Sequence, residues 1–282
     1  MESNNFNLTI EKGIAHLVLN RPAALNAMDQ GFWRDLPKFI EQADSTGEAR
    51  VIVISSTGKH FCAGIDLAMF SEPGSLPLTG DPSRMAENLR RLVLKMQDSL
   101  SSLENTRIPV LTAIQGGCIG GAVDLICASD SRYCTKDAYF TIKETQIGMT
   151  ADVGTLQRLP KLIPEGIVRE LAYTGRNYSA EEALFSGLVN QVFDDQEQML
   201  TEVMKIAGQI AQNSPLAVTG SKVMLNYARD HSVADSLNFM ATWQAGMFRG
   251  DDIARTMQAQ KSKQMPEYPA LWPKKGFFEG DY

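Results

Sequence analysis

Cysteine and histidine, the residues that most often build disulfides and zinc sites, are scarce in this chain of 282 residues. The three histidines have no metal-ligand spacing, so we expect no metal site. No Cys-x-x-Cys pair occurs, and most of the cysteines lie in apolar segments. We therefore predict buried free thiols and a reducing compartment. The four cysteines are Cys62, Cys118, Cys127 and Cys134.

An excess of positive charge is also missing. The 27 Lys and Arg residues are outnumbered by 33 Asp and Glu residues, which gives a formal net charge of −6 at pH 7. Because no global basic field exists, we expect neither nucleic acid nor an anionic membrane surface as a partner. Any anionic ligand must be held by a few local groups.

Targeting and membrane-spanning segments are not recognisable either. The first residues, MESNNFNLTIEKG, have neither the basic start and apolar core of a signal peptide nor the Arg-rich pattern of a transit peptide. No apolar run approaches the roughly 18 residues that span a bilayer. The final residues, GFFEGDY, are not the Ser-Lys-Leu peroxisomal address. We therefore expect a cytoplasmic protein.

What the sequence does contain is a mixture of strand and helix patterns in its first two-thirds. Alternating apolar residues at 6–20 predict two strands around a turn at Lys12-Gly13. Residues 71–83 are crowded with turn formers and predict a loop, and residues 84–105 predict a long amphipathic helix. Helix patterns dominate from 195 to about 263. The whole pattern predicts a mixed α/β core with a helical C-terminal extension.

Two glycine-containing turns, each between a strand pattern and a helix pattern, are candidate binding sites. The first, IQGGCIGGAVDL, fits neither nucleotide motif, because Cys118 occupies a glycine position and no lysine follows Gly121. Its bare backbone offers N–H groups at a helix start, although glycine serves close packing equally well. The second turn, HFCAGIDL, is similar, and its Asp66 is either a helix cap or part of a site. Together the turns can supply two converging N–H donors, as an oxyanion hole requires.

Two carboxylates in the stretch KETQIGMTADVG, Glu144 and Asp152, lie among apolar residues. Acidic side chains are rarely buried without a partner or a task. The pattern allows a pair that transfers protons. It also allows Asp152 as an N-cap, Glu144 as a surface charge and Asp124 as a buried polar anchor, and the residues alone leave these alternatives open.

Five motifs together resemble the crotonase (enoyl-CoA hydratase/isomerase) superfamily in their order and spacing. The resemblance covers roughly residues 5–265. Within the superfamily, Asp124, Glu144 and Asp152 are similar to the acids of the Δ3,5-Δ2,4-dienoyl-CoA isomerases, whereas hydratases have Glu at the first of these places and Gly at the third. The five motifs are NRPAALNAM, HFCAGIDL, GGCIGGAVDL, KETQIGMTADVGTLQRLP and EALFSGLVNQVF.

The resemblance implies an α/β fold, a crotonase-type spiral of ββα units that carries the active site over residues 1–200. Residues 201–282 would form a helical C-terminal region for trimerisation and active-site cover. A homotrimer, or a homohexamer of two stacked trimers, is implied. The implied substrate is an acyl-CoA, so that CoA is part of the substrate and no separate cofactor is expected.

The resemblance also assigns roles in the site. The N–H groups of Ile65 and Gly121 would hold the thioester oxygen. Asp152 would be the base at C2 and Glu144 the acid at C6, with Asp124 sharing a proton with Glu144 or orienting it; physical arguments alone do not choose between base and acid. The residues implied in CoA binding are Ala23, Ala24, Leu25, Gly64, Asp66, Leu67 and Ala68.

Two positions depart from the family pattern. Ala122 replaces the third glycine of a GGG run, which puts the width of the pocket in doubt, and Thr150 stands where the dienoyl isomerases have alanine. We also expect residues 70–85 in the pocket wall. The rival functions are an enoyl-CoA hydratase, another crotonase chemistry, and a catalytically silent scaffold that binds CoA or RNA.

Overall fold

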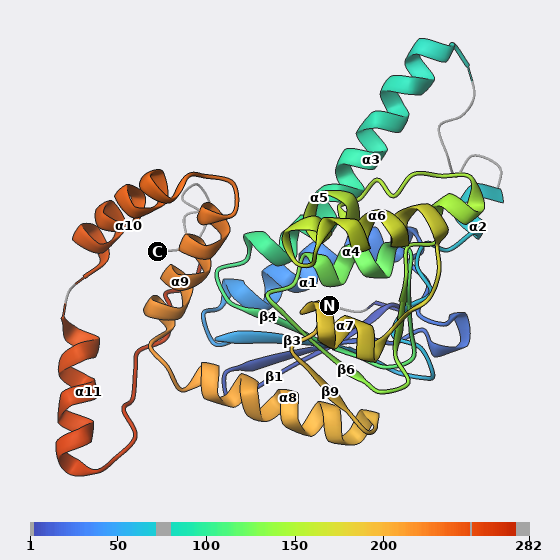
Figure 1. Ribbon diagram of the computed structural model, residues 1–282. Coiled ribbons are helices and arrows are strands. Elements are labelled where there is room, and N and C mark those ends of the chain that lie inside the picture. The colour runs from blue at the N-terminus through green and yellow to red at the C-terminus, as the bar shows by residue number, and fades with distance from the viewer. Residues whose placement is uncertain (1–2, 72–79, 249, 275–282) are drawn as a thin grey trace.

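The core of the molecule is a sheet of six strands with helices on both faces (Figure 1). The computed structural model describes residues 3–71, 80–248 and 250–274. The first two strands of the sheet pair antiparallel, and every other neighbouring pair is parallel. In spatial order the strands are β1 (Phe6–Glu11), β2 (Ile14–Leu19), β3 (Val51–Ser56), β4 (Val110–Ile114), β6 (Ser131–Thr135) and β9 (Gln191–Phe193).

The hairpin of β1 and β2 forms at the predicted turn. Lys12 and Gly13 both have positive φ, 51° and 78°. A two-residue turn needs this conformation to match the twist of its strands. Along β2 the side chains of Ala15, Leu17 and Leu19 are buried in alternation, which confirms the predicted strand pattern.

One face of the sheet is covered by α1 (Gln30–Ser45) and α4 (Gly121–Cys127) (Figure 1). Asp29 caps α1 by accepting the N–H of Phe32, and the apolar stripe of the helix then enters the main core. All seven residues of α4 are buried. A helix buried on every side needs apolar or small residues all round, which explains the sequence GAVDLIC.

The other face of the sheet is covered by α8 (Gln196–Ala211). Met199, Val203 and Ala207, at helical spacing, pack with Val51 and Val53 of β3 in a second apolar cluster. Because β3 is covered on both faces, every one of its residues is buried. The boundary expected at residues 200/201 lies inside α8.

The long helix α3 (Pro82–Asn105) confirms the prediction for residues 84–105. Its buried residues, Ser99, Leu100 and Leu103, all belong to its C-terminal part. The N-terminal half projects from the body of the molecule (Figure 1). Most of the loop predicted at 71–83 lies outside the described residues.

A second, three-stranded sheet contains two strands that the sequence pattern does not predict, β5 (Gly117–Ile119) and β8 (Tyr178–Ser179). They flank β7 (Tyr139–Thr141), which is predicted. Strands of two or three residues are too short for alternation to reveal. The remaining short helices are α2 (Ala68–Ser71), α5 (Thr155–Arg158), α6 (Glu165–Thr174), α7 (Ala180–Ser186) and 3-10 turns at Pro22–Ala24, Glu144–Ile147 and Leu159–Lys161.

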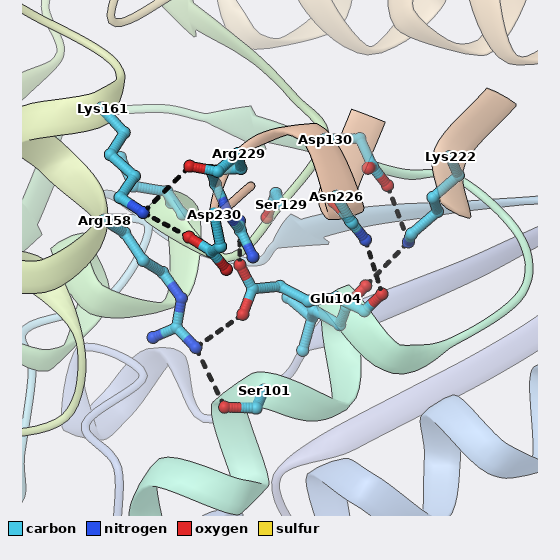
Figure 2. A network of polar contacts seen from close by, with 12 residues as sticks. Ser101, Glu104, Ser129, Asp130, Arg158, Lys161, Lys222, Asn226, Arg229 and Asp230 are labelled. Carbon is cyan, nitrogen blue, oxygen red and sulfur yellow. Dashed lines mark hydrogen bonds and ion pairs between the residues drawn. The ribbon is translucent and has the colours of Figure 1, made fainter. Parts of the chain in front are cut away.

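The last three helices form an arm beside the core (Figure 1). Lys222 fastens this arm, because its buried ammonium donates to the carbonyls of Leu103 and Ile108 and to Asp130 (Figure 2). The arm exposes large apolar side chains, among them Leu225, Val233, Leu237, Phe248 and Met257. Its helices are α9 (Pro215–Ala228), α10 (Val233–Met247) and α11 (Asp251–Ser262).

The four cysteines are buried and free, as predicted. Burial raises the pKa of the Cys62 thiol to about 12, so this thiol is protonated at neutral pH. Within the described ranges, no helix is long and apolar enough to cross a membrane. The same residues contain no group of three or more His, Cys, Asp or Glu side chains able to hold a metal ion.

Candidate active site

A cavity of about 250 Å³ lies where the two glycine turns meet the segment of residues 143–153. Ile65 comes from the HFCAGIDL turn, Gly121 comes from the IQGGCIGGAVDL turn, and both Glu144 and Asp152 face the same space. Most of the remaining wall is apolar, as small-molecule sites usually are. The other lining residues are Trp33, Ala63, Gly64, Leu67, Met96, Ile119, Gly120, Lys143, Ile147, Met149 and Val153.

The two turns are joined side by side because they follow adjacent parallel strands, β3 and β4. The main chains of Cys62 and Cys118 form an isolated parallel β-bridge. The N–H of Cys62 donates to the carbonyl of Gly117, and the N–H of Ile119 donates back to the carbonyl of Cys62. Gly64 has φ +84°, and a Cβ there would lie 2.5 Å from the carbonyl oxygen of Ile119. Only glycine permits this close approach.

Beside this approach, two main-chain donors have no hydrogen-bond partner among the described residues. The carbonyl of Gly64 and the N–H of Asp66 both bond to Met28, which bypasses the N–H of Ile65 between them. The N–H of Gly121, at the start of α4, likewise has no hydrogen bond within the described residues. A Cβ on Gly121 would lie 3.9 Å from the nitrogen of Ile65, so the two amides are close neighbours. This arrangement can bind a developing negative charge on oxygen.

Glu144 begins a 3-10 turn directly beside Gly120. A Cβ on Gly120 would lie 3.0 Å from Oε1 of Glu144. Oε2 of Glu144 is buried and has no hydrogen-bond partner in the described part of the chain. Burial, and then the negative charge of Asp124, raises the pKa of Glu144 to about 7. This carboxyl is therefore not the simple surface charge that its sequence position allowed.

Asp124 lies on the buried helix α4 and is fully inaccessible to solvent. Its Oδ1 accepts the N–H of Thr155 at 2.5 Å, while Oδ2 has no partner in the described structure. Burial raises the pKa of Asp124 to about 6, although the hydrogen bond from Thr155 opposes the shift. The side chain is both an anchor for α5 and part of the acidic group.

Asp152 is half-buried, and burial raises its pKa. Its charge also acts on Asp124 and Glu144, because it raises the pKa of both. Glu144 and Asp152 therefore line the cavity, and Asp124 lies buried within electrostatic reach of both. Asp152 does not cap the following helix: Gly154 occupies the N-cap position of α5, and no side chain caps it.

Of the residues expected to bind CoA, two line the cavity and the others do not. Leu25 and Leu67 are exposed, and the carbonyl of Leu25 accepts the N–H of Ala63 at 3.0 Å, which brings the two expected segments together. Ala23 and Ala24 belong to the 3-10 turn Pro22–Ala24. Gly64 and Leu67 line the cavity itself.

Asp66 serves as a cap, one of the two readings that its sequence position allowed. Its Oδ1 accepts the N–H of Ala68 at the start of α2, and its Oδ2 is paired with Arg21. Asp66 and Ala68 face a neighbouring polar cavity rather than the one that holds the acids.

Sequence reasoning missed part of the cavity wall. Trp33 on α1 and Met96 on α3 reach it only because those helices pack over the glycine turns. Helical periodicity marks both residues as apolar but carries no signal for the cavity. In the wall expected at residues 70–85, Met85 does not line the cavity, and residues 72–79 lie outside the described ranges.

Chemically, the site combines a two-amide donor with carboxyl groups of raised pKa. Such a set suits removal of a proton next to a carbonyl, with charge held at the carbonyl oxygen, and return of a proton elsewhere. An apolar wall of this kind limits the access of water to the reacting atoms. These features point to acid–base chemistry on a carbonyl compound with an apolar chain.

Comparison with known proteins identifies similar chains. The chain is 46% identical over 254 residues to the mitochondrial Δ3,5-Δ2,4-dienoyl-CoA isomerase of Mus musculus, covering 90% of this chain and 78% of that protein. It is 42% identical over 262 residues to the peroxisomal Δ3,5-Δ2,4-dienoyl-CoA isomerase of Arabidopsis thaliana, covering 93% and 94%. A short-chain-enoyl-CoA hydratase of Clostridium acetobutylicum is 29% identical over 260 residues, covering 92% and 95%.

The expectation of a cytoplasmic protein is wrong on this comparison. The relatives from Mus musculus and Dictyostelium discoideum are named as mitochondrial and that from Arabidopsis thaliana as peroxisomal, which points to organelles. The expectation depended on the lack of a recognisable address segment. Receptors read such addresses independently of the fold, so the core residues carry no information about compartment.

Solved structures and the family model agree on the fold. The enoyl-CoA hydratase of Bacillus anthracis matches with a TM-score of 0.84 at 27% identity, covering 94% of this chain and 98% of that one. The family model described as enoyl-CoA hydratase/isomerase matches residues 9–270. The α/β spiral with C-terminal helices is therefore confirmed, and the chain belongs to the enoyl-CoA hydratase/isomerase family, the crotonase superfamily.

Proposed function

We propose that this chain is a Δ3,5-Δ2,4-dienoyl-CoA isomerase. Relatives of that name are 42%, 44% and 46% identical to it over most of its length. The observation that carries the proposal is an apolar cavity lined by Glu144 and Asp152, with Asp124 buried within their electrostatic reach and two amides that have no partner among the described residues. A reaction that moves two double bonds needs one group to accept a proton and a second, distant group to supply one.

The reaction begins at C2 of the acyl chain, next to the thioester. The C2–H bond breaks, its proton passes to Asp152, and its electrons move through the carbonyl carbon to the thioester oxygen. The amides of Ile65 and Gly121 donate to that oxygen, and each donor contributes about 3 kcal/mol to such transition states. The intermediate is an enolate conjugated with the double bonds at C3 and C5.

The second half of the reaction takes place at C6. Glu144 delivers a proton to C6, while electrons return from the thioester oxygen to form the C2–C3 and C4–C5 double bonds. The raised pKa of Glu144, about 7, supports this role because the carboxyl still carries a proton near neutral pH. Asp124 orients Glu144 or shares a proton with it.

CoA binding is proposed at the rim of the cavity, along Ala23, Ala24 and Leu25 and along Gly64 to Ala68. The exposure of Leu25 and Leu67 beside the amide pair supports this path, since the thioester must enter there. No separate cofactor is required, because every step is a proton transfer.

The C-terminal arm is proposed to mediate assembly into a homotrimer or a hexamer of two trimers. Its exposed apolar side chains support this role, because soluble monomers rarely expose large contiguous apolar surfaces. Leu225 is 73% exposed, Val233 77% and Leu237 65%. Sedimentation of the purified protein measures the state directly.

The experiment that tests the function compares two substrates. Conversion of 3,5-dienoyl-CoA into the 2,4-dienoyl-CoA adds absorbance, because the double bonds become conjugated with the thioester. Hydration of 2-enoyl-CoA removes absorbance. We expect the first reaction to be much faster than the second; a chain that only hydrates 2-enoyl-CoA would contradict the proposal.

A further inference from the structure

Asp152 belongs to a segment, residues 151–154, that has no regular secondary structure of its own. Its carbonyl oxygen instead accepts a hydrogen bond of 2.6 Å from Nε2 of Gln97, on α3. The next carbonyl, that of Val153, accepts one of 3.3 Å from Nη1 of Arg158, on α5. Two side chains from different helices therefore hold consecutive peptide groups at the proposed base.

The side chain of Arg158 also forms hydrogen bonds with two side chains of α3. Its Nη2 donates to Oγ of Ser101 at 2.9 Å and to Oε2 of Glu104 at 2.7 Å, and Glu104 also binds Arg229 of the arm (Figure 2). The side chains of Arg158 and Glu104 are only 14% and 12% exposed. Burial opposes ionisation of Glu104, but the hydrogen bond and charge of Arg158 hold its pKa below the ordinary value. The Glu104 carboxyl is therefore ionised at neutral pH and accepts a charge-assisted hydrogen bond from Arg158.

Gly154 allows the guanidinium to come this close. Its φ is +135°, and a Cβ at that position would lie 1.8 Å from Nη1 of Arg158. The guanidinium therefore occupies the space that any side chain at residue 154 would need. The glycine, Arg158 and the carbonyl of Val153 form one packed unit behind Asp152.

Gln97 and Arg158 do not face the substrate cavity. They line a separate polar cavity of about 350 Å³, and Val153 lies between the two cavities and lines both. Their hydrogen bonds to the segment of the proposed base go to the main chain of residues 152 and 153. The polar cavity and the substrate cavity are therefore separated by the segment that carries the proposed base, Asp152.

We propose that Gln97 and Arg158 are positioning residues that clamp the carbonyls of Asp152 and Val153 and so hold the Asp152 carboxylate against C2 of the substrate. This inference rests on the proposed isomerase function. Reacting groups must be held close and aligned for proton transfer, and a misplacement of about 1 Å can cost on the order of a hundredfold in rate. Removal of the clamp lets the segment relax without touching the substrate.

The test uses Gln97→Met, which keeps the length of the side chain but removes its N–H donors. The matched control is Gln157→Met: Gln157 lines the same polar cavity, is exposed, and its side chain has no hydrogen bond within the described residues. Arg158→Lys is the second variant, because it keeps the charge beside Glu104 but loses the planar fork. For each protein, kcat, KM, the melting temperature and the isotope effect with C2-deuterated 3,5-dienoyl-CoA are measured.

We expect Gln97→Met to lower kcat by ten- to a hundredfold, with KM unchanged and a larger isotope effect, because removal of the C2 proton becomes slower. Arg158→Lys should change in the same direction, and Gln157→Met should match the wild type. The inference is overturned if both clamp variants keep the wild-type kcat, or lose rate only in proportion to the fraction unfolded. An inactive wild type in the same assay would reject the proposed function itself.

Discussion

Oδ1 of Asp124 accepts the main-chain N–H of Thr155 at 2.5 Å, which ties the buried helix α4 to the first residue of α5. Asp152 lies three residues before Thr155, so this bond fixes one end of its segment. The other oxygen of this carboxyl group, Oδ2, has no partner among the described residues, and the negative charge of Asp124 raises the pKa of Glu144. Asp124 is thus a support as well as a charge.

Asp124→Asn should therefore be the mildest of the acid substitutions. The amide oxygen of asparagine can still accept the N–H of Thr155, and the variant loses only the charge. We expect kcat to fall about tenfold, against the 10²–10⁴-fold typical of a group that transfers the proton itself. Steady-state rates of Asp124→Asn and Asp152→Asn decide the matter, and a greater loss in the Asp124 variant would reverse the proposed roles.

The pH dependence of kcat/KM should have a basic limb near pH 7. Glu144 must carry a proton to act as the acid, and its pKa is about 7. On the acidic side, activity should fall as Asp152 becomes protonated, at a pH above that of an ordinary aspartate because burial raises its pKa. The limbs belong to the coupled set of acids rather than to single residues.

Asp124→Asn tests this coupling. The negative charge of Asp124 is one of the causes that raise the pKa of Glu144, after burial itself. Removing the charge should move the basic limb to lower pH. A pH profile of the variant with its basic limb unmoved would show that the two carboxyls do not interact.

Glu144 should also make the fold less stable as pH rises. The folded state holds its proton up to about pH 7, whereas the ordinary value is 4.5. Below pH 4.5 Glu144 is protonated in both the folded and the unfolded chain and has no effect on stability. Between pH 4.5 and about pH 7 the unfolded chain loses this proton first, so the free energy of unfolding falls. Above about pH 7 the loss of stability is complete. The loss is on the order of 3 kcal/mol.

Glu144→Gln removes this loss. The variant should be more stable than the wild type at about pH 8 and similar to it near pH 4.5, while its activity is impaired. Denaturant unfolding at both pH values measures the difference. Glu48→Gln, in an exposed loop, is the control and should show no such dependence. Equal stabilities of the Glu144 variant and the wild type at the higher pH would count against a buried carboxyl.

The amide pair is tested by Gly64→Ala. This substitution combines the strain of φ +84° with a Cβ placed 2.5 Å from the carbonyl of Ile119, so the turn must shift. Gly187→Ala is a matched control, since Gly187 has the same φ but nothing within 4 Å of the added Cβ. Both variants should lose about 1–2 kcal/mol of stability from the backbone strain.

Only Gly64→Ala should also lose kcat, on the order of a hundredfold, as expected when an oxyanion donor is displaced. The comparison of kcat at a temperature where both variants are folded separates displacement of the donor from general destabilisation. An active Gly64 variant would show that the N–H of Ile65 is not required.

Features that depend on neighbours in the sequence were predictable. The hairpin at Lys12-Gly13 depends on two residues and their flanking strands, and the two glycine turns follow apolar strands whose pattern is plain. The turns meet because the parallel strands β3 and β4 end at the same edge of the sheet. There the main chains of Cys62 and Cys118 form a β-bridge. The joint role of Asp124, Glu144 and Asp152 was predictable only from the resemblance to the family. The sequence around Glu144 alone is equally compatible with a surface charge.

Features that depend on tertiary packing were not predictable. Trp33 and Met96 look like ordinary core residues of amphipathic helices, and the angle at which those helices cross the turns decides that they line the cavity. Gln97 bonds a carbonyl 55 positions away in the sequence, and no local pattern marks such a contact. The compartment was missed for a different reason, since the fold does not encode it.

The most direct test of the account is the turnover of 3,5-dienoyl-CoA by Asp152→Asn. Asparagine fills the same volume but cannot accept the C2 proton, so kcat should fall by 10²–10⁴-fold or more. The variant should stay folded, with a melting temperature no lower than that of the wild type, because the Asp152 side chain caps no helix and burial disfavours its charge. Near wild-type turnover in this variant would contradict the assignment of Asp152 as the base.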